Sequence, residues 1–305
     1  MAHLHNIYHQ LTPSIIRVLK KHNVKVVLTL HDYKLICPFY LALQHNGRKC
    51  LECAGNKFWK PVILNCQNSR LKEILFAIES IFHKWKGSYE LVDLFLTPSQ
   101  FLADLLSSRI ASKKIKVLYN GVDINSYLPS YSDQNYALYF GRISKEKGIE
   151  TLLKTHSKYA NTFPLKVVGT GEMENYFAKK YTDAEFLGYK KCEDLKKIIS
   201  NAAFVIVPSE WYENCSMTVL EAMASGKAVI GSSIGGIPEQ IDDGISGFLF
   251  KPGDILDLAS KLNILINSVD KRISMGDAAR LKIIKKYSLQ NHNSNLLKIY
   301  NDIIS

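Results

Sequence analysis

The chain of 305 residues has no run of about 18 uninterrupted apolar residues, so its sequence predicts no transmembrane helix. Its first residues, MAHLHNIYHQL, lack the basic region and apolar core of a signal peptide. Internal repeats, low-complexity tracts, dense Lys/Arg blocks and DNA- or RNA-binding motifs are also missing. We therefore expect a cytosolic protein and no nucleic-acid partner.

Acidic residues are scarce in the front part of the chain. Residues 1–125 hold 17 Lys/Arg against 8 Asp/Glu, whereas residues 126–305 hold 22 against 20. This asymmetry suggests an anionic partner, such as an acidic glycan or the inner face of a membrane bound peripherally. A solvated basic face explains it equally well.

Apolar residues recur at helical spacing within residues 69–86, from Leu71 to Trp85. Core packing is the expectation for this stripe. The neighbouring Lys72, Lys84 and Lys86 keep open the alternative of a helix lying on a membrane surface.

Strand and helix patterns alternate along most of the chain. Residues 24–30 form a short β-branched run typical of a buried parallel strand. A second series of strand and helix candidates follows the polar stretch 129–135, which predicts a second α/β unit with a parallel sheet. We expect domains at 1–125 and 126–287, and a final helix at 288–305 that packs back on the first domain.

Charged residues follow the strands of the second series, at the end where open α/β sheets bind ligands. Arg142 and Lys147 lie in GRISKEKG and can neutralise a diphosphate. Glu213 and Glu221 flank the start of a helix whose N-terminus suits a phosphate. Taken alone, each group can also be an ordinary solvated loop or helix acid. His31 ends the strand at 24–30, where a structural histidine is the simpler interpretation.

Four of the six cysteines have the spacing C-x12-C-x2-C-x12-C: Cys37, Cys50, Cys53 and Cys66. Four thiols with a central CxxC suit a structural zinc ion. Unligated thiols remain an alternative, and a disulfide or an iron–sulfur cluster is a further one.

Several segments together resemble the retaining glycosyltransferases of family 4, also called group 1 glycosyl transferases. The longest is PSEWYENCSMTVLEAMASGKAVIGSSIGGIPEQIDDGISGFLF; GRISKEKGIETLL, VVGTGE, FLGY and YNGVD match in the expected order. The resemblance implies a GT-B fold, an α/β architecture of two Rossmann-like domains facing across a cleft. It also implies transfer without a catalytic metal.

The resemblance gives roles to individual residues. Arg142 and Lys147 would hold the diphosphate of a UDP- or GDP-sugar, Glu221 the ribose, and Glu213 would face the sugar. His31 matches the histidine at the reacting centre. The other implied donor-binding residues are Gly141, Gly169, Gly171, Gly188, Tyr189, Asn214, Ser216, Met217, Thr218 and Val219.

By this resemblance, AHLHNIYHQL corresponds to the middle of the family's N-terminal domain, so we expect that domain to be incomplete in this chain. We also expect it to contain a Cys-rich insertion at 37–66. Two functions follow. The chain is an active transferase acting on a glycan or lipid-linked acceptor in surface polysaccharide synthesis, or it is a non-catalytic nucleotide-sugar-binding remnant or one half of a split enzyme.

Overall fold

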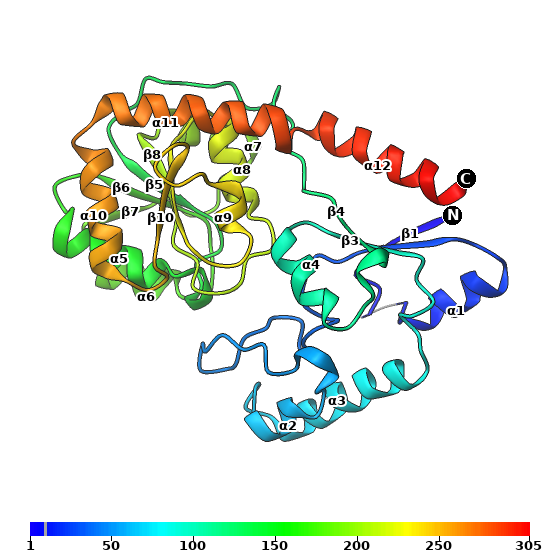
Figure 1. Ribbon diagram of the computed structural model, residues 1–305. Helices are drawn as coiled ribbons and strands as arrows, with labels where there is room; N and C mark the ends of the chain where they lie inside the picture. The colour runs from blue at the N-terminus through cyan, green and yellow to red at the C-terminus, as the bar shows by residue number, and fades with distance from the viewer. Residues whose placement is uncertain (9–10) are drawn as a thin grey trace. The chain divides into compact units, whose positions relative to one another are not determined.

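The computed structural model describes residues 1–8 and 11–305, which form two compact units (Figure 1). The first unit comprises Met1–Tyr119 and Ser294–Ser305, and the second comprises Asn120–Asn293. The boundary falls a few residues before the expected position at 125. Within the described part of the chain, no helix combines the length and apolar character needed to cross a membrane.

A four-stranded parallel sheet forms the centre of the first unit, in the order β1-β2-β3-β4. The apolar run expected at 24–30 contains β2, in which all four residues are buried. Strand β1 escaped sequence analysis because four residues with two histidines give no clear periodicity. The strands span Ala2–His5 (β1), Val26–Thr29 (β2), Leu94–Thr97 (β3) and Ile115–Val117 (β4), and the helices span Ser14–Lys21 (α1), Lys60–Leu64 (α2), Arg70–Trp85 (α3) and Gln100–Ser107 (α4).

The last helix, α12 (Leu289–Ile304), contributes its C-terminal part to the first unit. Ile299 is buried in an apolar cluster that includes Val27 and Leu96 of the sheet. The hydroxyl of Tyr300 also lies 2.5 Å from Nδ1 of His3 on β1. The end of the chain thus covers apolar strand residues near its beginning.

The apolar stripe of α3 differs from the expected packing. Its buried residues are Glu73 and Ala77, whereas Leu71, Leu75 and Trp85 are exposed. The expectation that this stripe packs in the core is therefore wrong. The physical reason is that the helix turns Glu73 and Glu79 inward, where Glu73 accepts a hydrogen bond from the Gln67 amide and Glu79 pairs with Lys34.

The second unit has a six-stranded parallel sheet in the order β10-β9-β8-β5-β6-β7. The chain moves outward from β5 to β7, returns to β8 beside β5, and continues outward to β10. This reversal is the topological switch point, beside which open α/β sheets bind ligands. The strands span Ala137–Phe140 (β5), Leu165–Val168 (β6), Ala184–Phe186 (β7), Phe204–Val207 (β8), Val229–Ser232 (β9) and Gly247–Phe250 (β10).

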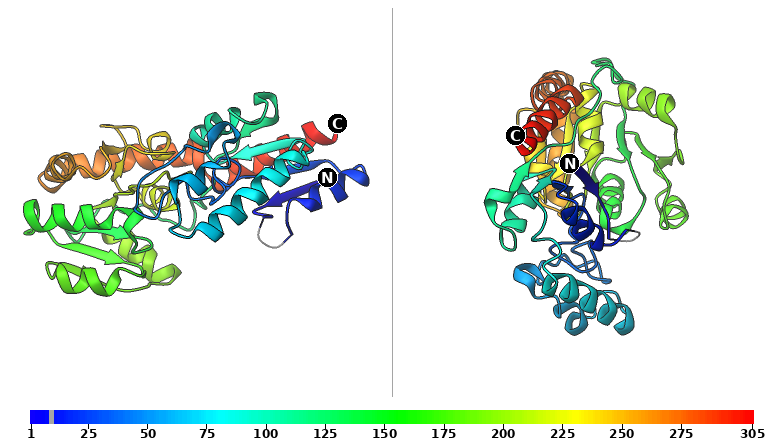
Figure 2. Two further views of the ribbon diagram at one scale, coloured as in Figure 1. Left: turned by 90° about the horizontal axis from the view of Figure 1, so that it is seen from below. Right: turned by 90° about the vertical axis from the view of Figure 1, so that its right-hand side faces the viewer.

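Helices flank this second sheet (Figure 2), with α5 packed on α10 and α8 packed on α11. The core between them includes the buried side chains of Leu152, Phe204, Ile230, Phe250 and Leu258. This burial fixes the strands and so positions the loops at their carboxyl ends. The helices span Ile149–Tyr159 (α5), Glu174–Lys180 (α6), Cys192–Asn201 (α7), Met217–Ala224 (α8), Ile237–Gln240 (α9), Ile255–Ile266 (α10) and Val269–Lys282 (α11).

Candidate functional site

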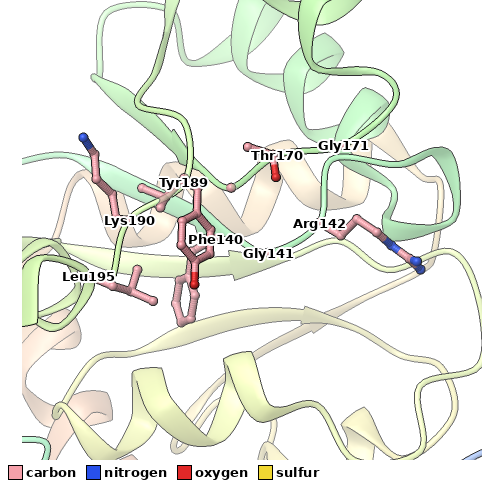
Figure 3. A pocket seen from close by; sticks show the side chains of 10 residues that line it. Phe140, Gly141, Arg142, Thr170, Gly171, Tyr189, Lys190 and Leu195 are labelled. Carbon is pink, nitrogen blue, oxygen red and sulfur yellow. The ribbon is translucent and has the colours of Figure 1, made fainter. Parts of the chain in front are cut away.

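A cavity of about 520 Å³ opens at the carboxyl ends of β5 and β6 in the second unit (Figure 3). Its volume is in the range of small-molecule sites. Five of the residues expected at the donor site line it: Gly141, Arg142, Gly169, Gly171 and Tyr189. The sequence had not indicated the remaining lining residues, which are Phe140, Val168, Thr170, Lys190 and Leu195.

Gly188 does not line the cavity but supports it, because its carbonyl accepts a hydrogen bond of 2.9 Å from the Gly169 amide. Tyr189 is largely exposed and presents its ring at the edge of the cavity (Figure 3). An exposed aromatic ring beside a cavity of this size offers a stacking surface for a flat ligand.

A smaller hollow adjoins the cavity, since Phe140 and Gly141 line both. It lies between the ends of β5 and β8, at the switch point. Expected site residues that line it are Lys147, Glu213, Ser216 and Thr218, and Ser209 joins them. The structure therefore brings the two motifs GRISKEKG and PSEWYENCS together, although about 60 residues separate them in the sequence.

Lys147 and Glu213 form an ion pair in this hollow. Lys147 Nζ lies 2.6 Å from Glu213 Oε1, and the Ser209 hydroxyl donates to the same oxygen at 2.8 Å. Lys147 Nζ also lies 5.4 Å from the ring centroid of Trp211. Glu213 is 7% exposed, so the carboxylate is held in a defined position.

Two glycines set the backbone around this pair. Gly148, which has φ +67°, follows Lys147, and a Cβ there would lie 1.8 Å from the Pro208 carbonyl oxygen. Gly235, which has φ +59°, packs so tightly on Glu213 that a Cβ would lie 2.3 Å from its carbonyl oxygen. The glycine-rich turn of GSSIGGIPE therefore serves as a support for the Glu213 loop.

Helix α8 begins beside the same hollow. Its N-cap is Ser216, whose hydroxyl accepts from the Val219 amide at 3.4 Å. The buried Gln240 side chain holds Ser216 by two hydrogen bonds of 2.9 Å, to its amide and its carbonyl. Sequence analysis had missed Gln240, whose polar side chain near a helix end gave no signal of its role.

The remaining expected residues around α8 differ in their exposure and in whether they line a hollow. Val219 is fully buried, so only its backbone can meet a ligand, whereas Met217 is exposed. Glu221 and Asn214 do not line either hollow. Burial raises the pKa of Glu221, and a hydrogen bond with Tyr127 opposes that rise.

Arg142 follows β5 directly and is the more exposed of the two expected cations. Its guanidinium pairs with Glu146 at 2.6 Å, and its side chain is 58% exposed. Figure 3 shows it on the opposite side of the cavity from Tyr189 and Lys190. An exposed cation with a local carboxylate partner is free to turn toward a bound anion at low cost.

His31 belongs to the first unit, two residues after β2. Its Nε2 lies 2.8 Å from Nδ1 of His5, and the two rings stack with centroids 5.1 Å apart. Burial and the nearby His5 lower the pKa of His31, while burial raises the pKa of the adjacent Asp32 to about 6. His5 was missed because it lies on the short strand β1.

The four clustered cysteines do not form the expected zinc site. Within residues 1–8 and 11–305, no three His, Cys, Asp or Glu side chains are arranged to hold a metal ion. A side-chain hydrogen bond joins Cys37 to Cys53 and lowers the pKa of Cys37 to about 7. All four thiols are free cysteines, and charge interactions link Cys53 to Cys37, Cys50 and Cys66, and Cys66 to Cys37 and Cys50.

Family models match most of the chain. The model for group 1 glycosyl transferases matches residues 124–282, and that for glycosyltransferase family 4 matches residues 2–126. The first match alone covers just over half of the 305 residues.

The curated relatives of the chain include several transferases. The chain is 28% identical over 262 residues to an uncharacterized glycosyltransferase of Methanocaldococcus jannaschii, covering 82% of this chain and 72% of that protein. It is 31% identical over 208 residues to the sulfoquinovosyl transferase of Arabidopsis thaliana, covering 62% of this chain and 40% of that protein. It is 30% identical over 224 residues to the lipopolysaccharide 1,2-N-acetylglucosaminetransferase of Salmonella typhimurium, covering 64% and 58%. The chain thus spans less than two thirds of the latter two.

Solved structures share the fold. Anabaena HepE in complex with UDP aligns with a TM-score of 0.75 at 18% identity, covering 98% of this chain and 78% of that one. Sucrose-phosphate synthase from Thermosynechococcus elongatus aligns with a TM-score of 0.74 at 19% identity, covering 99% and 73%. Both relationships place the two parallel-sheet units in the GT-B fold, and together with the family matches they show that this chain belongs to the group 1 glycosyl transferases.

Proposed function

We propose that this protein is a retaining glycosyltransferase that moves a sugar from a UDP- or GDP-sugar to a glycan or lipid-linked acceptor in surface polysaccharide or glycoconjugate synthesis. The observation that carries the proposal is the meeting of Lys147 and Glu213 at the β5–β8 switch point, beside a cavity of about 520 Å³. A cation, a fixed carboxylate and an adjacent apolar cavity match the three parts of a nucleotide-sugar: diphosphate, sugar and base.

The cations would act on the diphosphate. Lys147 would leave Glu213 and bind the phosphates, and Arg142 would turn in from the surface. Backbone amides at the start of α8, from Ser216 to Val219, would add donors and the positive end of the helix dipole. Together they would stabilise the charge that develops on the leaving phosphate as the glycosidic bond breaks.

The two carboxylates would orient the donor. Glu213, fixed by Ser209 and by the Gly235 turn, would accept hydrogen bonds from sugar hydroxyls. Glu221, held by Tyr127, would accept from the ribose diol. The base would lie in the cavity beside Tyr189, between the loops that contain Gly169, Gly171 and Gly188.

The first unit would serve the acceptor. Its candidate residue is His31, whose depressed pKa favours the neutral imidazole that can exchange a proton with a hydroxyl. The names of the relatives, a lipopolysaccharide transferase and a sulfoquinovosyl transferase, support a glycan or lipid-linked acceptor. The UDP in the HepE complex favours a UDP-sugar over a GDP-sugar. We place the protein in the cytoplasm, peripherally at the inner face of the membrane.

Calorimetry with UDP- and GDP-sugars, run beside an assay for nucleotide release in the presence of glycan and lipid-linked acceptors, tests this function. We expect saturable binding of at least one nucleotide-sugar and release that depends on the acceptor. Binding without release from any donor would instead identify a non-catalytic binding module. No binding of any nucleotide-sugar would contradict both.

A further inference from the structure

Helix α3 of the first unit presents its apolar side to solvent. Leu71 is 70% exposed, Leu75 and Ile78 are each 58% exposed, and Trp85 is 77% exposed. Ile74, Ile81 and Phe82 are exposed as well, which extends the same stripe over the whole helix. A contiguous apolar surface of this kind marks a docking site rather than ordinary solvent exposure.

The polar side of α3 is fixed against the rest of the unit. Glu73 is fully buried and accepts a hydrogen bond of 2.8 Å from the Gln67 amide. Glu79 pairs at 2.8 Å with Lys34, which is itself 6% exposed. Turning the apolar stripe inward would break this ion pair and leave the buried Lys34 ammonium without its carboxylate partner. The outward orientation of the stripe is therefore built into the unit.

Helix α2 enlarges the apolar surface, because it packs beside α3 at the periphery of the first unit (Figures 1 and 2). It adds the exposed side chains of Val62 and Ile63, and Trp59 immediately precedes it. We call this combined surface the α2–α3 face. Two of the three tryptophans of the chain, Trp59 and Trp85, lie on it.

Basic residues predominate on the α2–α3 face, where one of them, Lys60, pairs with the exposed Glu52 at 3.6 Å. Residues 57–86 contain six Lys/Arg and only two acidic residues, and those two are Glu73 and Glu79 on the inward side. Lys86 Nζ lies 5.1 Å from the ring centroid of Trp85 and 5.6 Å from that of Phe82. Cations thus border the exposed aromatic rings directly.

We infer that the α2–α3 face binds the surface of an anionic lipid bilayer. A stripe of aliphatic and aromatic side chains bordered by lysines is the composition of a helix that lies in the membrane interface. Tryptophan suits the boundary between headgroups and acyl chains, and the lysines complement anionic headgroups. Binding here would hold the enzyme where a lipid-linked acceptor lies, a consequence that rests on the proposed function.

Flotation of the full chain with lipid vesicles tests the inference without using the transfer reaction. We expect binding to vesicles of phosphatidylcholine mixed with phosphatidylglycerol that is at least tenfold tighter than binding to phosphatidylcholine alone. The double variant L75E/I78E should lose most of this binding. The matched control is Leu256→Glu, because Leu256 is 66% exposed on α10 of the second unit.

Fluorescence gives a second readout. In a Trp211→Phe background, the tryptophan fluorescence comes only from Trp59 and Trp85. On addition of anionic vesicles, we expect the emission maximum of this fluorescence to shift to the blue. We also expect brominated phosphatidylglycerol in the vesicles to quench it. Circular dichroism and urea unfolding of L75E/I78E show whether the first unit of that variant is folded, because helix α3 lies in that unit. Absence of binding to anionic vesicles, or equal losses in L75E/I78E and Leu256→Glu, would overturn the inference. So would a dimer in solution that L75E/I78E dissociates, because the face would then be covered by a second copy.

Discussion

Lys147 and Glu213 hold each other at 2.6 Å in the hollow where a diphosphate and a sugar would bind. Each is then the other's counter-ion before a ligand arrives. A diphosphate would compete with Glu213 for the lysine, and its binding would free the carboxylate to meet the sugar. The pair therefore couples recognition of the phosphates to recognition of the sugar.

This coupling predicts opposite effects on UDP affinity and transfer when Glu213 is removed. Glu213→Ala should bind UDP as tightly as the wild type or more tightly, because Lys147 no longer has a competing partner. Transfer should nevertheless fall by about 100-fold or more, the typical loss when a group that acts in the transition state is removed. Calorimetry with UDP measures the affinity, and steady-state assays measure the rate of transfer. A parallel loss of UDP affinity and transfer rate in Glu213→Ala would contradict the coupling.

Gly235 should be indispensable for the position of Glu213. Gly235→Ala introduces both a left-handed alanine and a Cβ 2.3 Å from the Glu213 carbonyl oxygen. The matched control is Gly244→Ala, since Gly244 has φ +75° but no atom within 4 Å of an added Cβ. Backbone strain alone costs about 1–2 kcal/mol.

Urea unfolding should show about that loss for Gly244→Ala and a larger loss for Gly235→Ala. Transfer should fall only in Gly235→Ala. Equal losses of stability in the two variants would show that the close approach to Glu213 has no energetic weight.

Asp32 should destabilise the protein at neutral pH. Burial raises its pKa from 3.8 to about 6, so the folded state favours the protonated form. The stability that this preference contributes is complete below pH 3.8 and is lost as the pH rises through about 6. Asp32→Asn keeps an oxygen for the hydrogen bond from the Lys34 amide and carries no charge.

The free energy of unfolding of Asp32→Asn should exceed that of the wild type by about 1–3 kcal/mol above the raised pKa, and by progressively less toward lower pH. Urea unfolding across a pH series measures the difference. The exposed Asp194, substituted by Asn, is the control and should show no such trend. A stability difference that is independent of pH would refute the assignment to Asp32 ionisation.

His5 should act on transfer by positioning His31. Their ring nitrogens lie 2.8 Å apart, so one imidazole fixes the tautomer and orientation of the other. His5→Phe should lower kcat about tenfold and leave UDP affinity unchanged, because His5 lies in the first unit. The acid limb of its pH–rate profile should also shift, since His5 helps to lower the pKa of His31. An unchanged profile with reduced kcat would point to a purely structural role.

Sequence patterns predicted what depends on local order along the chain. The strand at 24–30, the parallel sheet of the second unit and the meeting of GRISKEKG with PSEWYENC follow from periodicity and from the rule that strand ends gather at one edge. The hydrogen-bonding partners of the site residues could not be predicted in this way. Gln240 on Ser216 and His5 on His31 are contacts between distant segments, and neither leaves a periodic signal.

Two expectations failed because spacing does not determine three-dimensional placement. The stripe of α3 has the periodicity of a core helix, but the buried Glu73 and the Lys34–Glu79 ion pair lie on the inward side, and the stripe is exposed. The spacing of the four cysteines suits zinc, but within the described residues no three such side chains are arranged to hold a metal ion, and Cys37 hydrogen-bonds to Cys53.

Binding of UDP to the wild type, Lys147→Ala and Lys154→Ala tests the central claim most directly. Lys154 is an exposed lysine of α5 paired with Glu150, and so serves as the matched control. We predict saturable binding to the wild type and to Lys154→Ala, and at least tenfold weaker binding to Lys147→Ala. Equal affinity in all three proteins, or no binding to the wild type, would contradict a nucleotide-sugar site at the β5–β8 switch point.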